Sequence, residues 1–297
     1  MKHSLKIKLA PLALIAVAAM WGATFVLMKD SISRQPINDF LFTRFSLATL
    51  ILILLRPKAL TLINRDLALR GVGAGSFLGL GFIFQTYGLS NTTAAITGFV
   101  TGLYVVLTPL IAASILHRKV TGKAWIAVAI ATIGLTFLSF QGFSINFGAF
   151  LVLICVIFFS AHIIALGEWS AGRDTYAMTI TQLATCSAIT GVASIPGGYV
   201  SPPDKGVWGV VIFCAVFATA FAFIIQTWAQ SVMSPTTVAV LITNESVFAA
   251  LFAVWLGGEI LTPKIIIGGI LSNVTVILWL IAIDPHYAAL SFSFLVI

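Results

Sequence analysis

The sequence predicts an all-α integral membrane protein with ten transmembrane helices, arranged as two inverted repeats of five helices. Three observations lead to this prediction: an apolar composition, a division of the chain into ten apolar segments, and an internal repeat. Of the 297 residues, 60% are hydrophobic and 8% are charged, and the mean hydropathy is +1.09. A soluble domain carries about 25% charged residues because it needs a polar surface. We therefore expect lipid to surround most of this chain.

The placement of the basic residues and of the cysteines argues against nucleic-acid binding, disulfides and a metal site. The net charge of +7 could indicate nucleic acid, but the basic residues stand in short runs between apolar blocks. This placement is typical of topology signals and of contacts with anionic lipid headgroups. Cys155, Cys186 and Cys214 are scattered through apolar segments without CxxC spacing, so we predict neither a disulfide nor a metal site. Nothing in the sequence calls for a cofactor.

Ten segments are long enough to cross a hydrocarbon core about 30 Å thick, which needs about 20 helical residues. Each must be helical because backbone groups in lipid have to be satisfied within the segment. The linkers between them are short and hold charges or turn formers. The first segment is of span length, so we expect an uncleaved helix rather than a secretory signal. The predicted spans are 9–28, 38–55, 70–89, 93–116, 123–140, 147–167, 176–196, 206–229, 235–256 and 264–283.

The distribution of Lys and Arg predicts the orientation. With a cytoplasmic N-terminus, eleven basic residues fall on the cytoplasmic side and four on the other. Cytoplasmic loops of membrane proteins are enriched in these residues, so both termini are expected in the cytoplasm. The cytoplasmic set is Lys2, Lys6, Lys8, Arg56, Lys58, Arg65, Arg70, Arg118, Lys119, Lys123 and Arg173, and the opposite set is Lys29, Arg34, Lys205 and Lys264.

An internal repeat relates the two halves of the chain. A shift of 141 residues sets Gln85-Thr86-Tyr87 against Gln226-Thr227-Trp228, and a shift of 138 pairs Trp21 with Phe159 and Arg44 with Gln182. Each half has five predicted spans, and an odd number makes the second half enter the membrane upside down. Inverted repeats recur in secondary transporters, with the substrate site between the repeats near the midplane. We assign residues 1–142 and 143–286 to the two repeats and 287–297 to a short apolar tail.

The order and spacing of several short motifs resemble the drug/metabolite transporter superfamily, and within it the EamA-like ten-helix group. The first half contributes Trp21-Gly22 with Phe25, Arg44-Phe45, Gln85-Thr86-Tyr87-Gly88-Leu89 and the stretch from Thr101 to Pro109; the second contributes Gln226-Thr227-Trp228-Ala229, Ser234-Pro235 and the stretch from Glu245 to Leu251. The resemblance implies transport of amino acids or related metabolites, often export, across a bacterial inner membrane. The family usually has proline directly after this glutamate. Ser246 stands here instead, so the sequence does not decide whether the helix is kinked at this position.

Glu245 is the candidate site residue with the clearest physical argument. It lies about ten residues into the ninth predicted span, or about 15 Å at 1.5 Å per residue, close to the midplane. A carboxyl group at that depth is costly and marks a functional site by default. It suits a proton carrier or a partner for a substrate ammonium group. The alternative is a structural carboxyl satisfied by neighbouring hydroxyls and backbone.

The other candidates divide into pathway and structural residues. Gln85 and Gln226 would form interhelical hydrogen bonds or paired gates. Trp21 and Tyr104 stand too far from span ends for an interfacial belt, which favours a cavity wall. Arg44 would tie helix ends together or bind headgroups. The pathway set is Glu245, Trp21, Phe25, Gln85, Tyr104, Gln226, Trp228 and Asn244; the structural or gating set is Arg44, Gly71, Gly75, Gly79 and Pro109. His162 is expected to be a satisfied polar residue rather than a proton relay.

These observations predict a secondary transporter that works by alternating access, as a monomer or homodimer in the bilayer. No Walker motif is present, so an ion gradient, with protons as one candidate, would drive transport. A passive channel would need a ring of polar residues. An intramembrane enzyme would need paired aspartates or HExxH, and the predicted spans hold neither. The substrate is expected to be a small molecule. We do not expect the protein to be an enzyme.

Overall fold

The computed structural model describes residues 2–117 and 147–258, with residues 122, 125–126, 128–130, 132–133 and 263, and side chains from Leu9 onward. All regular secondary structure in these residues is helical. Eight helical stretches are long and apolar enough to cross a membrane, and each overlaps one predicted span. They are Leu9–Arg34, Ile37–Leu55, Arg65–Asn91, Ala94–Ser114, Phe147–Trp169, Thr175–Gly197, Lys205–Gln230 and Pro235–Trp255. Eight predicted spans are therefore confirmed; spans 123–140 and 264–283 lie largely or wholly outside the described residues.

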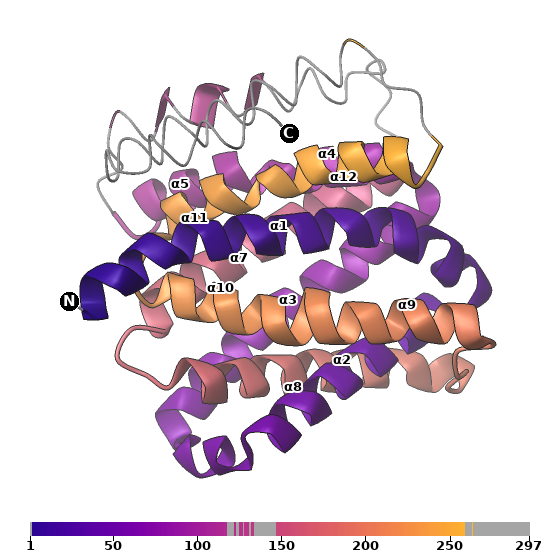
Figure 1. Ribbon diagram of the computed structural model, residues 1–297, viewed down its shortest axis with the longest axis horizontal. Coiled ribbons are helices and arrows are strands. Elements are labelled where there is room, and N and C mark those ends of the chain that lie inside the picture. Colours follow the sequence, from indigo (N-terminus) through magenta and orange to yellow (C-terminus); the bar gives the residue numbers. More distant parts are fainter. Residues whose placement is uncertain are drawn as a thin grey trace.

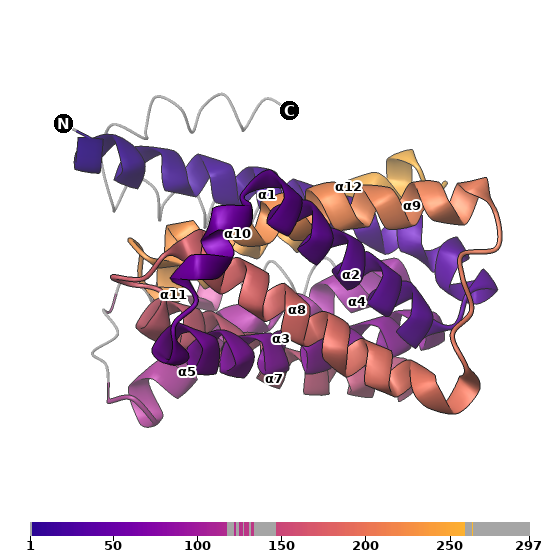
Figure 2. The ribbon, with the colours of Figure 1, turned by 90° about the horizontal axis from the view of Figure 1, so that it is seen from below.

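The helices of the two halves interleave instead of forming separate lobes (Figures 1 and 2). Helix α1 runs between α12 and α10, and α3 packs against α7 and α8. The first half consists of α1 (Lys2–Arg34), α2 (Ile37–Leu55), the 3-10 helix η1 (Pro57–Leu62), α3 (Arg65–Asn91), α4 (Ala94–Gly102) and α5 (Tyr104–Ser114). The second consists of α7 (Phe147–Trp169), α8 (Thr175–Ser194), the 3-10 helix η2 (Ile195–Gly197), α9 (Lys205–Ala215), the π-helix η3 (Val216–Phe221), α10 (Ala222–Gln230), α11 (Pro235–Ile242) and α12 (Asn244–Trp255).

Apolar side chains cover the outside of the bundle, and many polar ones lie inside it. Leu54 is 70% exposed and Trp255 is 78% exposed, whereas Thr97, Thr101 and Gln182 are fully buried. The interior also holds many apolar side chains, so what distinguishes the bundle from a water-soluble domain is its apolar exterior. Buried hydroxyls and amides can link helices through hydrogen bonds where lipid offers no partner. The distribution supports a multi-pass membrane protein.

Short polar side chains in the linkers start several helices. Asn64 accepts a hydrogen bond from the Leu67 N–H at the start of α3, and Asp174 accepts one from Ala177 at the start of α8. Asp204 accepts from Gly206 and Val207 before α9. The Val207 N–H is the main cause that holds the pKa of the Asp204 carboxyl below its usual value. Such caps satisfy the free N–H groups of a helix's first turn.

Ion pairs join the two halves of the chain at both ends of the bundle. At the end that carries the loop before α9, one pair links α1 to that loop. At the opposite end, two pairs link α2 and α3 to the loop between α7 and α8. The pairs are Arg34–Asp204 at 2.6 Å, Arg56–Asp174 at 3.1 Å and Arg173–Asp66 at 2.7 Å. Each is partly exposed, so its net stabilisation is small, about 1 kcal/mol or less.

Two of the spans are broken near their middle. The span that begins at Ala94 changes from α4 to α5 at Leu103, and the span that begins at Pro235 changes from α11 to α12 at Thr243. The second break occurs without a proline after Glu245. The Thr243 hydroxyl bonds to Ala239 O at 2.6 Å and the Asn244 amide to Leu241 O at 2.8 Å, so side chains take backbone acceptors of the preceding helix. The substitution of Ser246 for the usual proline therefore does not remove the discontinuity.

A row of glycines brings α3 into close contact with α8. A Cβ atom added at Gly75 would lie 2.6 Å from the carbonyl oxygen of Gln182, and one added at Gly79 would lie 3.3 Å from Cys186 Cα. At Gly71 the nearest atoms belong to Thr181. Small residues at such spacing let helix backbones approach in a membrane. The predicted Gly71, Gly75 and Gly79 row thus lies at the interface between the two halves.

Candidate functional site

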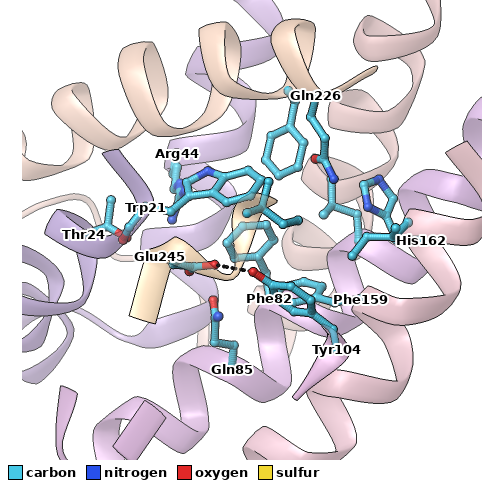
Figure 3. Close-up of a pocket in the computed structure, with 14 residues that line it drawn as sticks. Trp21, Thr24, Arg44, Phe82, Gln85, Tyr104, Phe159, His162, Gln226 and Glu245 are labelled. Carbon is cyan, nitrogen blue, oxygen red and sulfur yellow. Dashed lines mark hydrogen bonds between the residues drawn. The ribbon is translucent and has the colours of Figure 1, made fainter. Parts of the chain in front are cut away.

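An internal cavity lies where the halves meet, and eight helices supply its walls (Figure 3). The walls combine one carboxyl group, one guanidinium group, two amides, an imidazole and several aromatic rings. The space within admits water centres over about 30 Å³, enough for about two or three waters. The smallest amino acid has five non-hydrogen atoms, more than two or three waters provide. The lining residues are Trp21, Thr24, Arg44, Leu78, Phe82, Gln85, Tyr104, Phe159, His162, Ile163, Phe223, Gln226, Ile242 and Glu245.

Arg44 reaches the cavity from α2 and is 1% exposed. Its Nε donates to Thr219 Oγ1 at 2.7 Å and its Nη2 to Ala218 O at 3.3 Å. The guanidinium carbon also stands 4.8 Å from the centre of the Phe82 ring, a favourable position for a cation. The headgroup-binding interpretation is wrong for this conformation, because the side chain points inward. Its hydrogen-bond partners in the described residues are neutral, and no described residue forms an ion pair with it.

The π-helix η3 supplies the acceptors for Arg44. The indole Nε1 of Trp21 donates to the same carbonyl, Ala218 O, at 2.9 Å. A π-helix shifts the backbone register by one residue, and such turns occur often at functional sites. Helices α1 and α2 of the first half are thereby anchored to one turn of the second half. The sequence from Val216 to Phe221 contains no proline or glycine that would have indicated this turn.

Glu245 enters the cavity from the first turn of α12 and is 6% exposed. Its carboxylate accepts a long hydrogen bond from Tyr104 Oη at 3.4 Å, drawn as a dashed line in Figure 3. A hydrogen bond of that length is weak. Glu245 stands just after the break at Thr243, and Tyr104 just after the break at Leu103. The discontinuities therefore place both side chains at the centre of the bundle.

The two glutamines of the repeated triplet differ in their bonding. The Gln85 amide donates to Thr101 Oγ1 at 3.2 Å, which links α3 to α4. Gln226, 2% exposed, has a buried Oε1 without a hydrogen-bond partner in the described part of the chain. Both line the cavity. The interhelical bond that the sequence favoured thus exists for Gln85, whereas the Gln226 amide is directed into the cavity (Figure 3).

His162 lies on α7 and is 1% exposed. Its Nε2 is 2.9 Å from Gln182 Oε1. The Gln182 amide nitrogen donates to Met178 O at 3.3 Å and to Thr227 Oγ1 at 3.4 Å. The Nε2 side of the ring therefore has the hydrogen-bond partner that is expected of a satisfied polar residue. The ring also lines the cavity, which the sequence did not indicate.

Three contacts join residues that are 141 positions apart, the spacing of the internal repeat. Ser46 Oγ lies 2.7 Å from Ser187 Oγ. The Phe82 and Phe223 ring centres are 6.0 Å apart. The bond from Tyr104 to Glu245 is the third. These contacts come from three different pairs of spans. The contacts of Phe82 with Phe223 and of Tyr104 with Glu245 follow the register of the Gln-Thr-aromatic triplets, whereas Ser46 and Ser187 lie three residues off the shift of 138 that aligns their spans.

Three of the candidate pathway residues lie outside the cavity walls. Phe25 is buried on α1, with its ring near Gly98 of α4. Trp228 is half-buried on α10, and Asn244 is buried at the helix break. Pro109, assigned a structural or gating role, is buried within α5. The cavity therefore brings together Trp21, Gln85, Tyr104, Gln226 and Glu245 from the predicted set, and adds Arg44 from the structural set.

Sequence reasoning missed most of the aromatic wall. Phe82 contacts the rings of Phe45, Phe159 and Phe223, with centres 5.2 to 6.0 Å apart. Phenylalanine is common throughout this chain, with 23 copies, so composition alone does not distinguish a cavity wall from a lipid contact. The repeat could have helped, since Phe82 and Phe223 share its register.

A helical bundle with an apolar exterior and a cavity between its halves that holds several polar side chains is typical of a polytopic membrane transporter. The sequence profile of the EamA-like transporter family matches residues 8–140 and again residues 146–281. This chain belongs to that family. A protein of Archaeoglobus fulgidus described as an uncharacterized transporter is 34% identical over 277 residues, which cover 91% of this chain and 85% of that protein. A solved crystal structure of a protein whose description gives no function has the same fold. Its TM-score with this chain is 0.75 at 16% sequence identity, and the match covers 91% of this chain and 95% of the other chain.

Proposed function

We propose that the protein is a secondary transporter that moves a zwitterionic small metabolite, an amino acid or a close relative, by alternating access. The observation that carries this proposal is the pair of opposite charges in one cavity, Arg44 and Glu245. Among the described residues, the hydrogen-bond partners of Arg44 are neutral and Glu245 has one long hydrogen bond. A buried charge without a charged partner is costly. A zwitterion supplies a carboxylate for Arg44 and an ammonium group for Glu245, so it compensates both.

The cavity supports alternating access over a passive channel. Its small volume means that a metabolite fits only after the walls separate, and ion pairs join the halves at both ends. The contacts of Phe82 with Phe223 and of Tyr104 with Glu245 support a two-fold axis in the membrane plane between inverted repeats. Broken helices at the axis are a recurring feature of transporters with such repeats. Opening one end while the other stays closed is then a movement of one half against the other.

Export across a bacterial inner membrane, driven by a proton gradient, completes the proposal. Family membership supports the membrane location and the class of protein. Two described residues of the cavity walls, Glu245 and His162, can bind a proton, and Glu245 is the acidic one. A proton and a substrate ammonium group would compete for the same carboxylate, which is one simple way to couple their movements.

Counterflow in proteoliposomes tests the proposal. The purified protein is reconstituted with each unlabelled compound inside, and uptake of its labelled form is measured. Leucine, the amine that lacks its carboxyl group and the acid that lacks its amino group form a matched set. We expect a transient overshoot with zwitterions and none with the other two. Counterflow of all three alike would contradict recognition of both charges, and downhill flux without an overshoot would indicate a channel.

A further inference from the structure

Gln226 and His162 form a second polar group in the cavity, separate from the two charged residues. They come from α10 and α7 of the second half, and Figure 3 shows the Gln226 amide extending toward His162. The exposed fraction is 2% for Gln226 and 1% for His162. The proposed charge recognition uses neither residue.

The Gln226 oxygen is a buried acceptor that the described protein residues do not satisfy. Most buried polar atoms in proteins have a hydrogen-bond partner, and one without it is costly to keep. The equivalent amide in the first half, Gln85, has its partner in Thr101. The difference between two residues at equivalent positions indicates that the acceptor of Gln226 is reserved for something that enters the cavity.

The hydrogen bonds around His162 define its acceptor. A backbone carbonyl can only accept, so the contact with Met178 O identifies the nitrogen of the Gln182 amide. The Gln182 oxygen therefore faces His162 and accepts from Nε2–H. In the neutral imidazole, Nδ1 is then the acceptor of the ring. The group thus has one acceptor without a partner among the described residues, Gln226 Oε1, and a second acceptor on the imidazole ring that lines the same cavity, His162 Nδ1.

We infer that Gln226 and His162 form a subsite that binds the side chain of the substrate and selects one with a hydrogen-bond donor. This inference rests on the proposed transport of a zwitterion and specifies its class: an amino acid with a hydroxyl, amide or similar N–H or O–H group, in preference to an apolar side chain of the same size.

Matched ligands test the subsite. Threonine and valine have the same shape and differ by a hydroxyl, while O-methylserine keeps an ether oxygen but cannot donate. Dissociation constants come from the ligand-dependent melting temperature of the purified protein, which rises with binding to the folded state, and from competition in counterflow. We expect threonine to bind about tenfold more tightly than valine, the value of one favourable hydrogen bond. O-methylserine should resemble valine.

Gln226→Met removes the acceptor and nearly keeps the side-chain length. The threonine-to-valine ratio should then fall toward one. Because the substitution removes an unpartnered buried polar atom, the variant should fold with an unchanged or higher melting temperature. Gln230→Met is the matched control, since it removes another buried amide of α10, one that lies outside the cavity walls, and it should keep the wild-type ratio.

The outcomes separate the subsite from the proposed function. Equal binding of threonine and valine by the wild type, or an unchanged ratio in Gln226→Met, overturns the subsite and leaves zwitterion recognition intact. If amino acids fail to bind but butane-2,3-diol does, and Gln226→Met abolishes that binding, the subsite stands and zwitterion recognition is overturned. If no ligand of this set binds, both are overturned.

Discussion

Replacement of Glu245 by Gln separates the charge of the cavity from its packing. The native contact of the carboxylate is a hydrogen bond of 3.4 Å from Tyr104. The variant keeps the size of the side chain and an acceptor oxygen for Tyr104, so little of this contact is lost. We expect the free energy of unfolding to change by less than about 1 kcal/mol. The loss for a substrate ammonium group is larger, because a charge-assisted hydrogen bond contributes about 1.5–3 kcal/mol. Affinity for zwitterions should therefore fall about 10- to 150-fold.

The assay for Glu245→Gln combines thermal unfolding in detergent with counterflow in proteoliposomes at mildly acidic and mildly alkaline pH. Glu168→Gln is the matched control, because Glu168 is exposed and lies outside the cavity walls. The control should transport like the wild type. If Glu245→Gln also transports with wild-type affinity at both pH values, the carboxyl is structural and its assignment to substrate or proton handling is refuted. A Glu245→Gln protein that binds normally but loses the pH dependence would assign the group to the proton alone.

Two further predictions concern topology and packing. Alkaline phosphatase fused near Ser201 should be active in a bacterial host and a fusion after Ile297 inactive, as the basic residues indicate; the opposite pattern would reverse the predicted orientation. Gly75→Ala should lower stability by about 1–3 kcal/mol through overpacking, since its Cβ would lie 2.6 Å from the Gln182 carbonyl oxygen. Gly209→Ala, on a helix with nothing within 4 Å of the added atom, should be neutral or slightly stabilising; equal losses in both variants would disprove the close approach of α3 and α8.

The sequence predicted the described spans well because their signal is local. Hydropathy over about 20 residues reports how a segment interacts with lipid, and the start of α8, Thr175, falls one residue from its predicted position. The breaks at Leu103 and Thr243 were not predicted, because the apolar character of each span continues unchanged across the break. The π-helix from Val216 to Phe221 was missed for the same reason.

The candidate site was predicted in part. Depth alone identified Glu245, since a carboxyl in the middle of an apolar segment is unusual. Arg44 was placed nearer to the membrane surface, because position along one helix does not show the direction of a long side chain. Phe25 and Trp228 share motifs with cavity residues but lie outside the cavity walls, and the Phe25 ring lies near Gly98 of α4. Which face of a helix meets the cavity is decided by the tilt and rotation of its neighbours, and a single sequence does not contain that information directly.

The contact between Tyr104 and Glu245 has a consequence for the number of charges that the cavity can hold. A symmetric homodimer of one half would place the same side chain on both sides of this contact, because an isologous interface pairs a residue with its own copy. Two glutamates would then face each other as like charges, and two tyrosines would leave the centre without a carboxyl. A single polypeptide that carries both halves can differ at this one position. Joining two halves of different sequence in one polypeptide thus permits a single acid at this contact, whereas a homodimer would carry two or none.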